Sequence, residues 1–189
     1  MVAYVIIPGI YGSDERHWQS RWERRWGPSA VRTAPASWSE PDLPDWVAAI
    51  QSAYEIAAGR DHRVALVAHS LGCWAVAHWL RETRPDAVTT FLVAPPDTHD
   101  PRFPRDAAPT FVNLDALPLP GPSLLVASDD DPYCDAETSL SLAKGWQTRA
   151  LLLEGRGHIN SDSGLGEWAE GLELLRGLVD GDGDGGSDG

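Results

Sequence analysis

The chain alternates short, continuous apolar runs with longer segments in which apolar residues recur every three or four positions. A short apolar run bounded by turn residues is typical of a strand buried on both faces, and the longer period is typical of a helix. We therefore predict strands over residues 2–8, 31–34, 64–68, 88–94, 123–127 and 148–153. We predict helices over residues 17–26, 43–58, 71–84, 136–146 and 165–178.

Strands that alternate with helices favour parallel pairing, right-handed crossovers and helices on both faces of the sheet. The predicted fold class is therefore α/β, a three-layer α/β/α sandwich with about six mostly parallel strands. The helix over residues 17–26 carries Trp18, Trp22 and Trp26 on one face, which we expect to pack on the sheet. Residues 97–122 are rich in Pro and Asp and are predicted to be mainly loop.

The length of the chain fits a single domain, which we place at residues 1–179. Residues 180–189 contain only Gly, Asp and Ser, and we predict a disordered acidic tail there. Its Asp-Gly repeat matches the first half of an EF-hand calcium loop but lacks the glutamate of the twelfth position. We expect no metal and no other cofactor.

The formal net charge is −13, and a surface this acidic repels phosphate backbones and anionic lipid. We therefore expect no nucleic-acid partner and no membrane partner. The first residues contain no basic segment of the kind that opens a signal peptide, and the two cysteines, Cys73 and Cys134, are expected to be free thiols. We expect a cytoplasmic protein that is a monomer or a weak homodimer.

The segment Ala68-His69-Ser70-Leu71-Gly72 lies between a predicted strand and a predicted helix. This context is typical of a nucleophile elbow, in which a strained turn exposes the serine hydroxyl. Small residues are needed two positions before and after the serine, and here Ala68 replaces the more usual glycine. The alternative is that Ser70 is an ordinary helix N-cap.

In folds with such an elbow the acid and then the histidine follow the serine along the chain. His158 comes directly after the last predicted strand, between glycines that allow its loop to reach the serine. We expect it to be the base. We expect the side chain of His69 to point away from Ser70, and His78 is too far along the helix to reach the hydroxyl.

The acid is expected after the strand over residues 123–127, where three aspartates follow one another. We predict Asp131, because Pro132 restricts the backbone directly after it. Asp129 and Asp130 are interpreted as solvated loop charges. Asp97, which follows the preceding strand, is the alternative acid.

Acyl transfer also requires two N–H donors directed at the developing oxyanion. One is expected to be the backbone N–H of Leu71. The other is expected from the loop after the first strand, where Ile10 is favoured and Tyr11 is the alternative.

Together these residues resemble the YdeN-like serine hydrolases, the α/β-hydrolase group that includes retinoblastoma-binding protein nine. The matching stretches are Pro8-Gly9 with Gly12-Ser13, His17-Trp18-Gln19 with Arg21-Trp22-Glu23, His69-Ser70-Leu71-Gly72-Cys73, Asp130-Asp131-Pro132-Tyr133, and Gly157-His158-Ile159-Asn160 with Ser163-Gly164-Leu165-Gly166-Glu167-Trp168. The resemblance implies a minimal α/β-hydrolase fold with little or no lid, and metal-free hydrolysis through a Ser-His-Asp triad. It also implies that His17 and Trp18 lie near the oxyanion loop, and we expect both, with Tyr11 and His69, to line the substrate pocket.

We therefore expect a serine hydrolase that cleaves small carboxylic esters or related acyl compounds through an acyl-enzyme on Ser70. One alternative is an amidase or aminopeptidase-like enzyme with the same triad. Another is a binding protein that retains the hydrolase fold without catalysis. The expected partner is a small-molecule ester or amide.

Overall fold

The sheet consists of six parallel strands, and a computed structural model describes it within residues 1–181 of the chain. The strands are β1 (Ala3–Ile7), β2 (Ala30–Arg32), β3 (Val64–His69), β4 (Val88–Val93), β5 (Ser123–Ser128) and β6 (Arg149–Leu153). Their spatial order is β2-β1-β3-β4-β5-β6. The predicted six-stranded parallel sheet is confirmed, and its strand ends differ from the sequence prediction by at most two residues.

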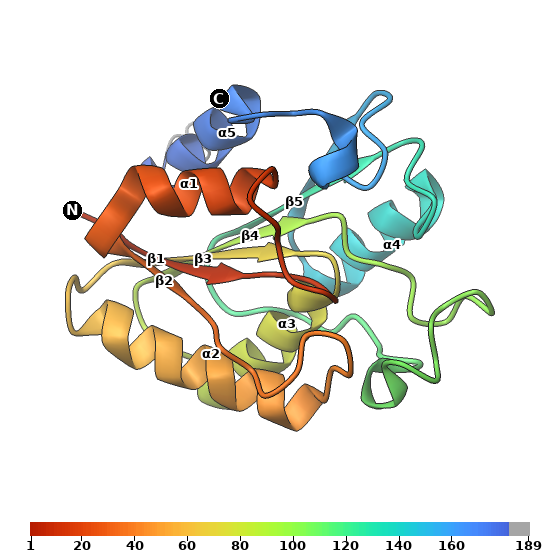
Figure 1. The fold of residues 1–189 in the computed structure, drawn as a ribbon, viewed down its shortest axis with the longest axis horizontal. Helices are drawn as coiled ribbons and strands as arrows, with labels where there is room; N and C mark the ends of the chain where they lie inside the picture. Colours follow the sequence, from red (N-terminus) through yellow and green to blue (C-terminus); the bar gives the residue numbers. More distant parts are fainter. Residues whose placement is uncertain (182–189) are drawn as a thin grey trace, which may run out of the picture.

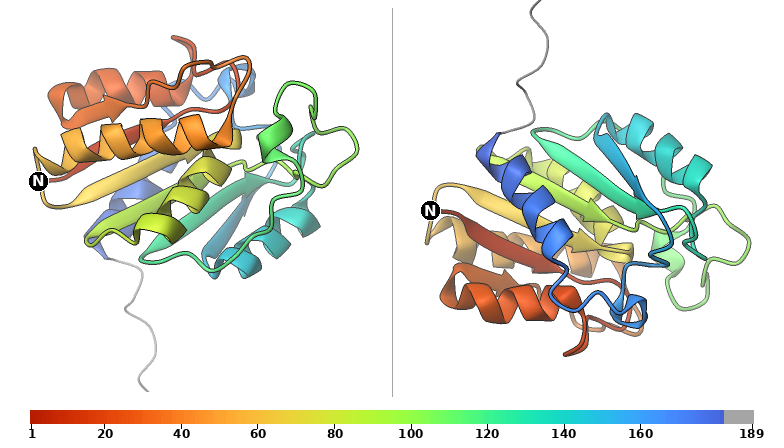
Figure 2. Two further views of the ribbon diagram at one scale, coloured as in Figure 1. Left: turned by 90° about the horizontal axis from the view of Figure 1, so that it is seen from below. Right: turned by 90° about the horizontal axis from the view of Figure 1, so that it is seen from above.

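Five helices form the outer layers of the sandwich, namely α1 (Trp18–Trp26), α2 (Leu43–Ala58), α3 (Leu71–Thr83), α4 (Ala136–Trp146) and α5 (Ala169–Asp180). One face of the sheet packs against α1 and α5, and the other packs against α2, α3 and α4 (Figures 1 and 2). The α/β/α arrangement is therefore confirmed. No helix within residues 1–181 is both long and apolar enough to cross a membrane.

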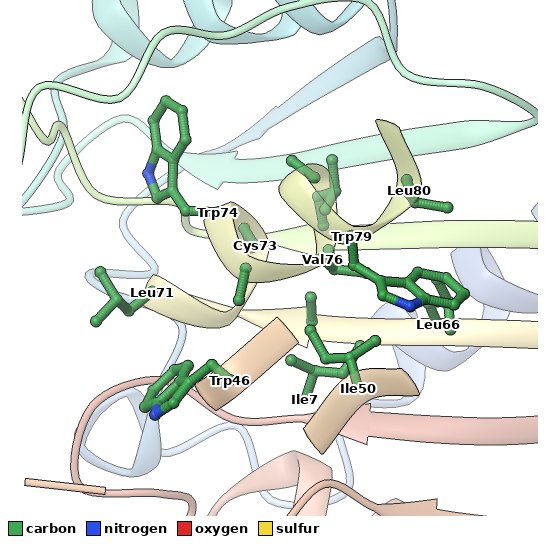
Figure 3. Packing of buried hydrophobic residues seen from close by; sticks show 14 of the residues in the cluster. Ile7, Trp46, Ile50, Leu66, Leu71, Cys73, Trp74, Val76, Trp79 and Leu80 are labelled. Atoms are coloured by element: carbon green, nitrogen blue, oxygen red, sulfur yellow. The ribbon is translucent and has the colours of Figure 1, made fainter. Parts of the chain in front are cut away.

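The core has two halves because side chains of a strand alternate between the two faces of the sheet. On β3, Leu66 and Ala68 belong to the cluster under α2, α3 and α4, whereas Ala65 and Val67 belong to the cluster under α1 and α5. Figure 3 shows Leu66 beside Trp79 of α3. Burial on both faces explains why β3 has a continuous apolar sequence.

The tryptophan face of α1 packs on the sheet as predicted. Trp18 and Trp22 are fully buried, and Trp26 stacks on Tyr4 of β1 with ring centroids 3.8 Å apart. The indole N–H of Trp22 donates to the carbonyl of Glu167, 2.7 Å away. This face therefore joins the first helix to both the sheet and the chain that leads into α5.

The closing helix begins at Ala169, four residues later than the predicted start at Leu165. Gly164 and Gly166 have positive φ, and Trp168 is left-handed with φ 40°, so the chain turns here instead of coiling. The Trp168 ring packs directly against Gly171, where a larger residue would collide with it. The prediction also placed the tail from residue 180, but α5 includes Asp180, and residues 182–189 lie outside the described part of the chain.

Candidate active site

Ser70 lies at the sharp turn between β3 and α3, at the carboxyl end of the sheet. Its backbone has φ 53° and ψ −125°, a conformation that L-residues rarely adopt and that costs roughly 1–3 kcal/mol. Its side chain caps no backbone N–H of α3, so the N-cap alternative is wrong. The turn instead directs the hydroxyl toward the loops that follow the other strands.

Two glycines allow the chain to pass close to this turn. A Cβ on Gly72 would lie 2.5 Å from the carbonyl oxygen of Pro8, and a Cβ on Gly9 would lie 2.7 Å from the Cβ of Ser70. Ala68, which replaces the usual glycine, is completely buried within the core. The small residues thus bring β1, its following loop and the serine into direct contact.

The imidazole of His158 contacts the serine hydroxyl, with 2.9 Å between His158 Nε2 and Ser70 Oγ. Its other nitrogen, Nδ1, lies 2.9 Å from Oδ2 and 3.1 Å from Oδ1 of Asp131. A carboxylate only accepts hydrogen bonds, so Nδ1 carries the proton and Nε2 is free to accept the hydroxyl proton. The three side chains form one directed hydrogen-bond chain.

Asp131 is the acid that faces the histidine. Its carboxylate is 1% exposed, and its Oδ1 also accepts the backbone N–H of Tyr133 at 2.9 Å. The alternative acid, Asp97, accepts the backbone N–H of His99 instead. No hydrogen bond joins Asp97 to His158 in the part of the chain that the structure describes.

Asp129 and Asp130 are exposed loop residues, as predicted, and they also accept hydrogen bonds that the sequence did not indicate. Asp130 accepts the N–H of Gly157 at 2.7 Å and the hydroxyl of Ser128 at 2.6 Å, and Asp129 accepts the N–H of Gly155 at 2.9 Å. The hydrogen bonds from Ser128 and Gly157 lower the pKa of Asp130. These two carboxylates therefore hold the loop that carries His158.

The two candidate N–H donors in the loop after β1, those of Ile10 and Tyr11, differ in whether they already donate a hydrogen bond. The N–H of Tyr11 donates to the carbonyl of Trp38 at 2.7 Å, so it is already used. The N–H of Ile10 enters no hydrogen bond among the described residues, and neither does that of Leu71. Ile10 directly follows Gly9 and Leu71 directly follows Ser70, the two residues that lie in close contact, so these N–H groups remain the candidate pair.

A cavity of about 490 Å³ opens beside Ser70 and His158. Of the four predicted pocket residues, Tyr11, His17 and His69 line it. Trp18 does not, because its indole is buried in the core cluster between α1, α5 and the sheet. The indole N–H of Trp18 donates instead to the carbonyl of Ile159 at 2.8 Å, which supports the loop beyond His158.

His69 contacts the backbone of His158, the candidate base, and among the described residues its side chain makes no hydrogen bond to Ser70, as expected. Its Nε2 lies 3.0 Å from the backbone carbonyl of His158, so it must donate there, and the two ring centroids are 4.9 Å apart. Burial, followed by the charges of His17 and His158, holds the pKa of His69 well below its usual value. A neutral ring here avoids a second positive charge beside His158.

Sequence reasoning missed several residues of the site. Phe103 and Pro104 line the cavity from the predicted loop over residues 97–122, and Pro96 lines it from directly before that loop, whose composition did not indicate an apolar surface. The buried Gln19 amide donates to the carbonyls of Ile7 at 3.2 Å and Val67 at 2.9 Å, which ties β1 to β3 beside the elbow. A polar glutamine inside the tryptophan face of α1 was the signal that could have identified it.

Comparisons with known proteins agree with this geometry. Residues 4–177 match the family model described as serine hydrolase. A candidate YdeN-like hydrolase from Pectobacterium atrosepticum is 31% identical, with a TM-score of 0.80 over 95% of this chain and 91% of that chain. The ydeN gene product of B. subtilis is 19% identical, with a TM-score of 0.69 over 95% and 98% of the two chains.

Est1E from Butyrivibrio proteoclasticus, solved with bound ferulic acid, shares the fold at 12% identity, with a TM-score of 0.69 over 96% of this chain and 88% of that chain. No curated protein sequence matches the chain significantly. The match over residues 4–177 covers nearly the whole described chain, and the resemblance to YdeN-like proteins drawn from the motifs is confirmed. The chain belongs to the serine hydrolase family, on the α/β-hydrolase fold.

Proposed function

We propose that this hydrolase cleaves small carboxylic esters through an acyl-enzyme on Ser70. The observation that carries the proposal is the hydrogen-bond chain from Ser70 through His158 to Asp131 at the wall of a 490 Å³ cavity. A cavity of this size accepts a small acyl compound. The apolar side chains of Leu71, Phe103 and Pro104 suit the acyl part of such a substrate.

The proposed reaction starts from His158 with its proton on Nδ1 and with Nε2 free to accept the proton of Ser70. His158 Nε2 takes the proton of Ser70 Oγ as the oxygen attacks the ester carbonyl, and the N–H groups of Ile10 and Leu71 stabilise the oxyanion. The imidazolium, stabilised by Asp131, then gives its proton to the departing alcohol oxygen. Water, activated by His158, releases the carboxylic acid and restores Ser70.

Labelling with a fluorophosphonate probe tests the nucleophile. We expect covalent modification of Ser70 in the native protein and none in Ser70→Ala, together with hydrolysis of short p-nitrophenyl esters by the native protein alone. Absence of both labelling and hydrolysis would support a binding protein on the hydrolase fold. Faster turnover of aminoacyl p-nitroanilides than of the esters would replace the esterase by an amidase.

Replacement of the acid tests the assignment of roles. We expect Asp131→Asn to lower kcat by about 10³–10⁴-fold, because the neutral amide no longer stabilises the imidazolium or its tautomer. Asp97→Asn removes the same charge from the neighbouring loop and should leave kcat within about twofold of the native value. Steady-state kinetics of both variants decide between the two aspartates, and near-normal turnover in Asp131→Asn would contradict the triad.

A further inference from the structure

His17 is a buried histidine with one ring nitrogen left unpaired. It is the N-cap of α1, it is 3% exposed, and its Nδ1 accepts the N–H of Gln19 at 3.1 Å. An Nδ1 that accepts a hydrogen bond carries no proton, so the neutral ring carries its proton on Nε2. Within residues 1–181 this buried Nε2 has no hydrogen-bond partner. Such a donor is rare in folded proteins, and a polar group that enters the cavity lined by His17 would satisfy it once the ring tilts toward that group.

The ring stays neutral at physiological pH. Burial lowers the pKa of His17 to about 4, the charges of Arg32 and His158 act in the same direction, and Asp14 opposes them. His17 therefore offers one N–H and no positive charge. A donor of this kind suits a neutral acceptor, such as a hydroxyl or ether oxygen.

The location of His17 indicates which part of a substrate it would meet. Its side chain lines the cavity beside Ser70, and its ring centroid is 4.7 Å from that of His69, which in turn is 4.9 Å from that of His158. Three imidazoles thus form a row that ends at the proposed base. Polar residues continue this wall, where Ser161 Oγ donates to Asp14 at 2.6 Å and Asp14 accepts the backbone N–H of His17 at 3.0 Å.

In the proposed reaction His158 returns its proton to the leaving alcohol, so the alcohol must depart on the side of His158. We infer that the Nε2–H of His17 binds an oxygen on the alcohol part of the substrate, and that the enzyme therefore prefers esters of hydroxyl-bearing alcohols to esters of alkyl alcohols. This inference rests on the proposed esterase function. The polar side of the cavity, formed by His17, Asp14 and Ser161, would then bind the leaving alcohol. The apolar side, formed by Leu71, Phe103 and Pro104, would bind the acyl group.

Two substitutions of His17 distinguish the role of Nδ1 from the role of Nε2. Asparagine at position 17 retains a polar group at the place of Nδ1, where its side-chain oxygen can cap α1, but it has no donor at the place of Nε2. Glutamine retains a donor near the place of Nε2 and loses the cap. His78→Asn is the matched control, because His78 lies on the surface of α3 beside Glu82 and does not line the cavity.

The substrates are 2-hydroxyethyl butanoate and propyl butanoate, which differ by a hydroxyl in place of a methyl group. We expect the ratio of their kcat/KM values, hydroxyethyl over propyl, to fall about tenfold in His17→Asn, which corresponds to the loss of one hydrogen bond. The ratio should stay near the native value in His17→Gln and His78→Asn. An unchanged ratio in His17→Asn, or equal losses in the Asn and Gln variants, would overturn the inference and leave His17 as a ring that only packs on His69.

A binding measurement keeps this test independent of turnover. In Ser70→Ala protein, NMR titration with the two esters should show that His17→Asn weakens binding of the hydroxyethyl ester about tenfold relative to the propyl ester. If the native enzyme hydrolyses neither ester and Ser70 is not labelled, the proposed function fails, and the relative affinities still decide the role of His17. Equal relative affinities with and without the substitution would refute it.

Discussion

At the scale of single residues, the position of Ser70, the proposed nucleophile, depends on a glycine that carries no reactive group. A Cβ on Gly9 would lie 2.7 Å from Ser70 Cβ, which is closer than packing allows, and 3.2 Å from Ser70 Oγ, which is tighter than most contacts. We expect Gly9→Ala to displace either Ser70 or the oxyanion loop and to lower kcat about 100-fold, since displacements of about 1 Å have effects of this size. Overpacking should also lower the free energy of unfolding by about 1–3 kcal/mol, measured by urea unfolding.

The control for this substitution is Gly177→Ala. Gly177 lies in α5, where an added Cβ meets nothing within 4 Å, so alanine should raise the free energy of unfolding by about 0.5–1 kcal/mol and leave kcat unchanged. Native turnover in Gly9→Ala would show that the loop yields without cost and that its contact with Ser70 does not position the nucleophile.

The turn at Ser70 was predictable because it depends on local sequence context. Ser70 is recognised by the small neighbours that a strained turn between strand and helix requires. The hydrogen bonds of Asp129 and Asp130 could not be predicted from the sequence, because the three successive aspartates share one local pattern. What distinguishes their side chains is which group each contacts in the loop that carries His158, 27 residues later in the chain. The exclusion of Trp18 from the cavity likewise depends on how α1 rotates against the sheet.

At the scale of elements, the loop after β6 is held by the loop after β5. Asp130 accepts hydrogen bonds from Ser128 and from the N–H of Gly157, the residue directly before His158. We expect Asp130→Ala to release this loop and lower kcat by about 10- to 100-fold with little change in KM, because His158 would sample positions away from Ser70. Steady-state kinetics measure the effect.

Asp106→Ala removes the same charge from an exposed site in the 97–122 loop that makes no hydrogen bond to the loop of His158. It should retain native kcat. If both variants have equal activity, the hydrogen bonds of Asp130 do not position His158, and the contacts of Asp129, His69 and Trp18 with this loop remain as its supports.

The strands and most helices were predictable because burial on one or two faces imposes a period on the sequence. The start of α5 was not, because residues 165–168 have a helical apolar pattern that the left-handed backbone of Trp168 interrupts. In that conformation the ring of Trp168 stacks on Trp22 of α1, with ring centroids 5.7 Å apart. Contacts between elements this distant in sequence leave no local pattern.

At the scale of the whole molecule, burial of two neutral histidines beside the site links stability to pH. The pKa of His17 is lowered to about 4 and that of His69 lies well below its usual value, in both cases chiefly through burial. In the unfolded chain both titrate near pH 6.5, so between pH 6.5 and 4 the unfolded state binds more protons than the folded state. Stability is therefore complete above about pH 6.5 and is lost as the pH falls toward 4.

We expect the free energy of unfolding to fall across this interval by about 3 kcal/mol from His17 alone, at about 1.4 kcal/mol per pKa unit, with His69 adding to the loss. Urea unfolding at half-unit steps from pH 4 to 7.5 measures the slope. His17→Asn should remove the part due to His17, since asparagine does not titrate, whereas His78→Asn should retain the native slope. A free energy of unfolding that is constant over this range would mean that the two imidazoles accept protons in the folded state as readily as in the unfolded one.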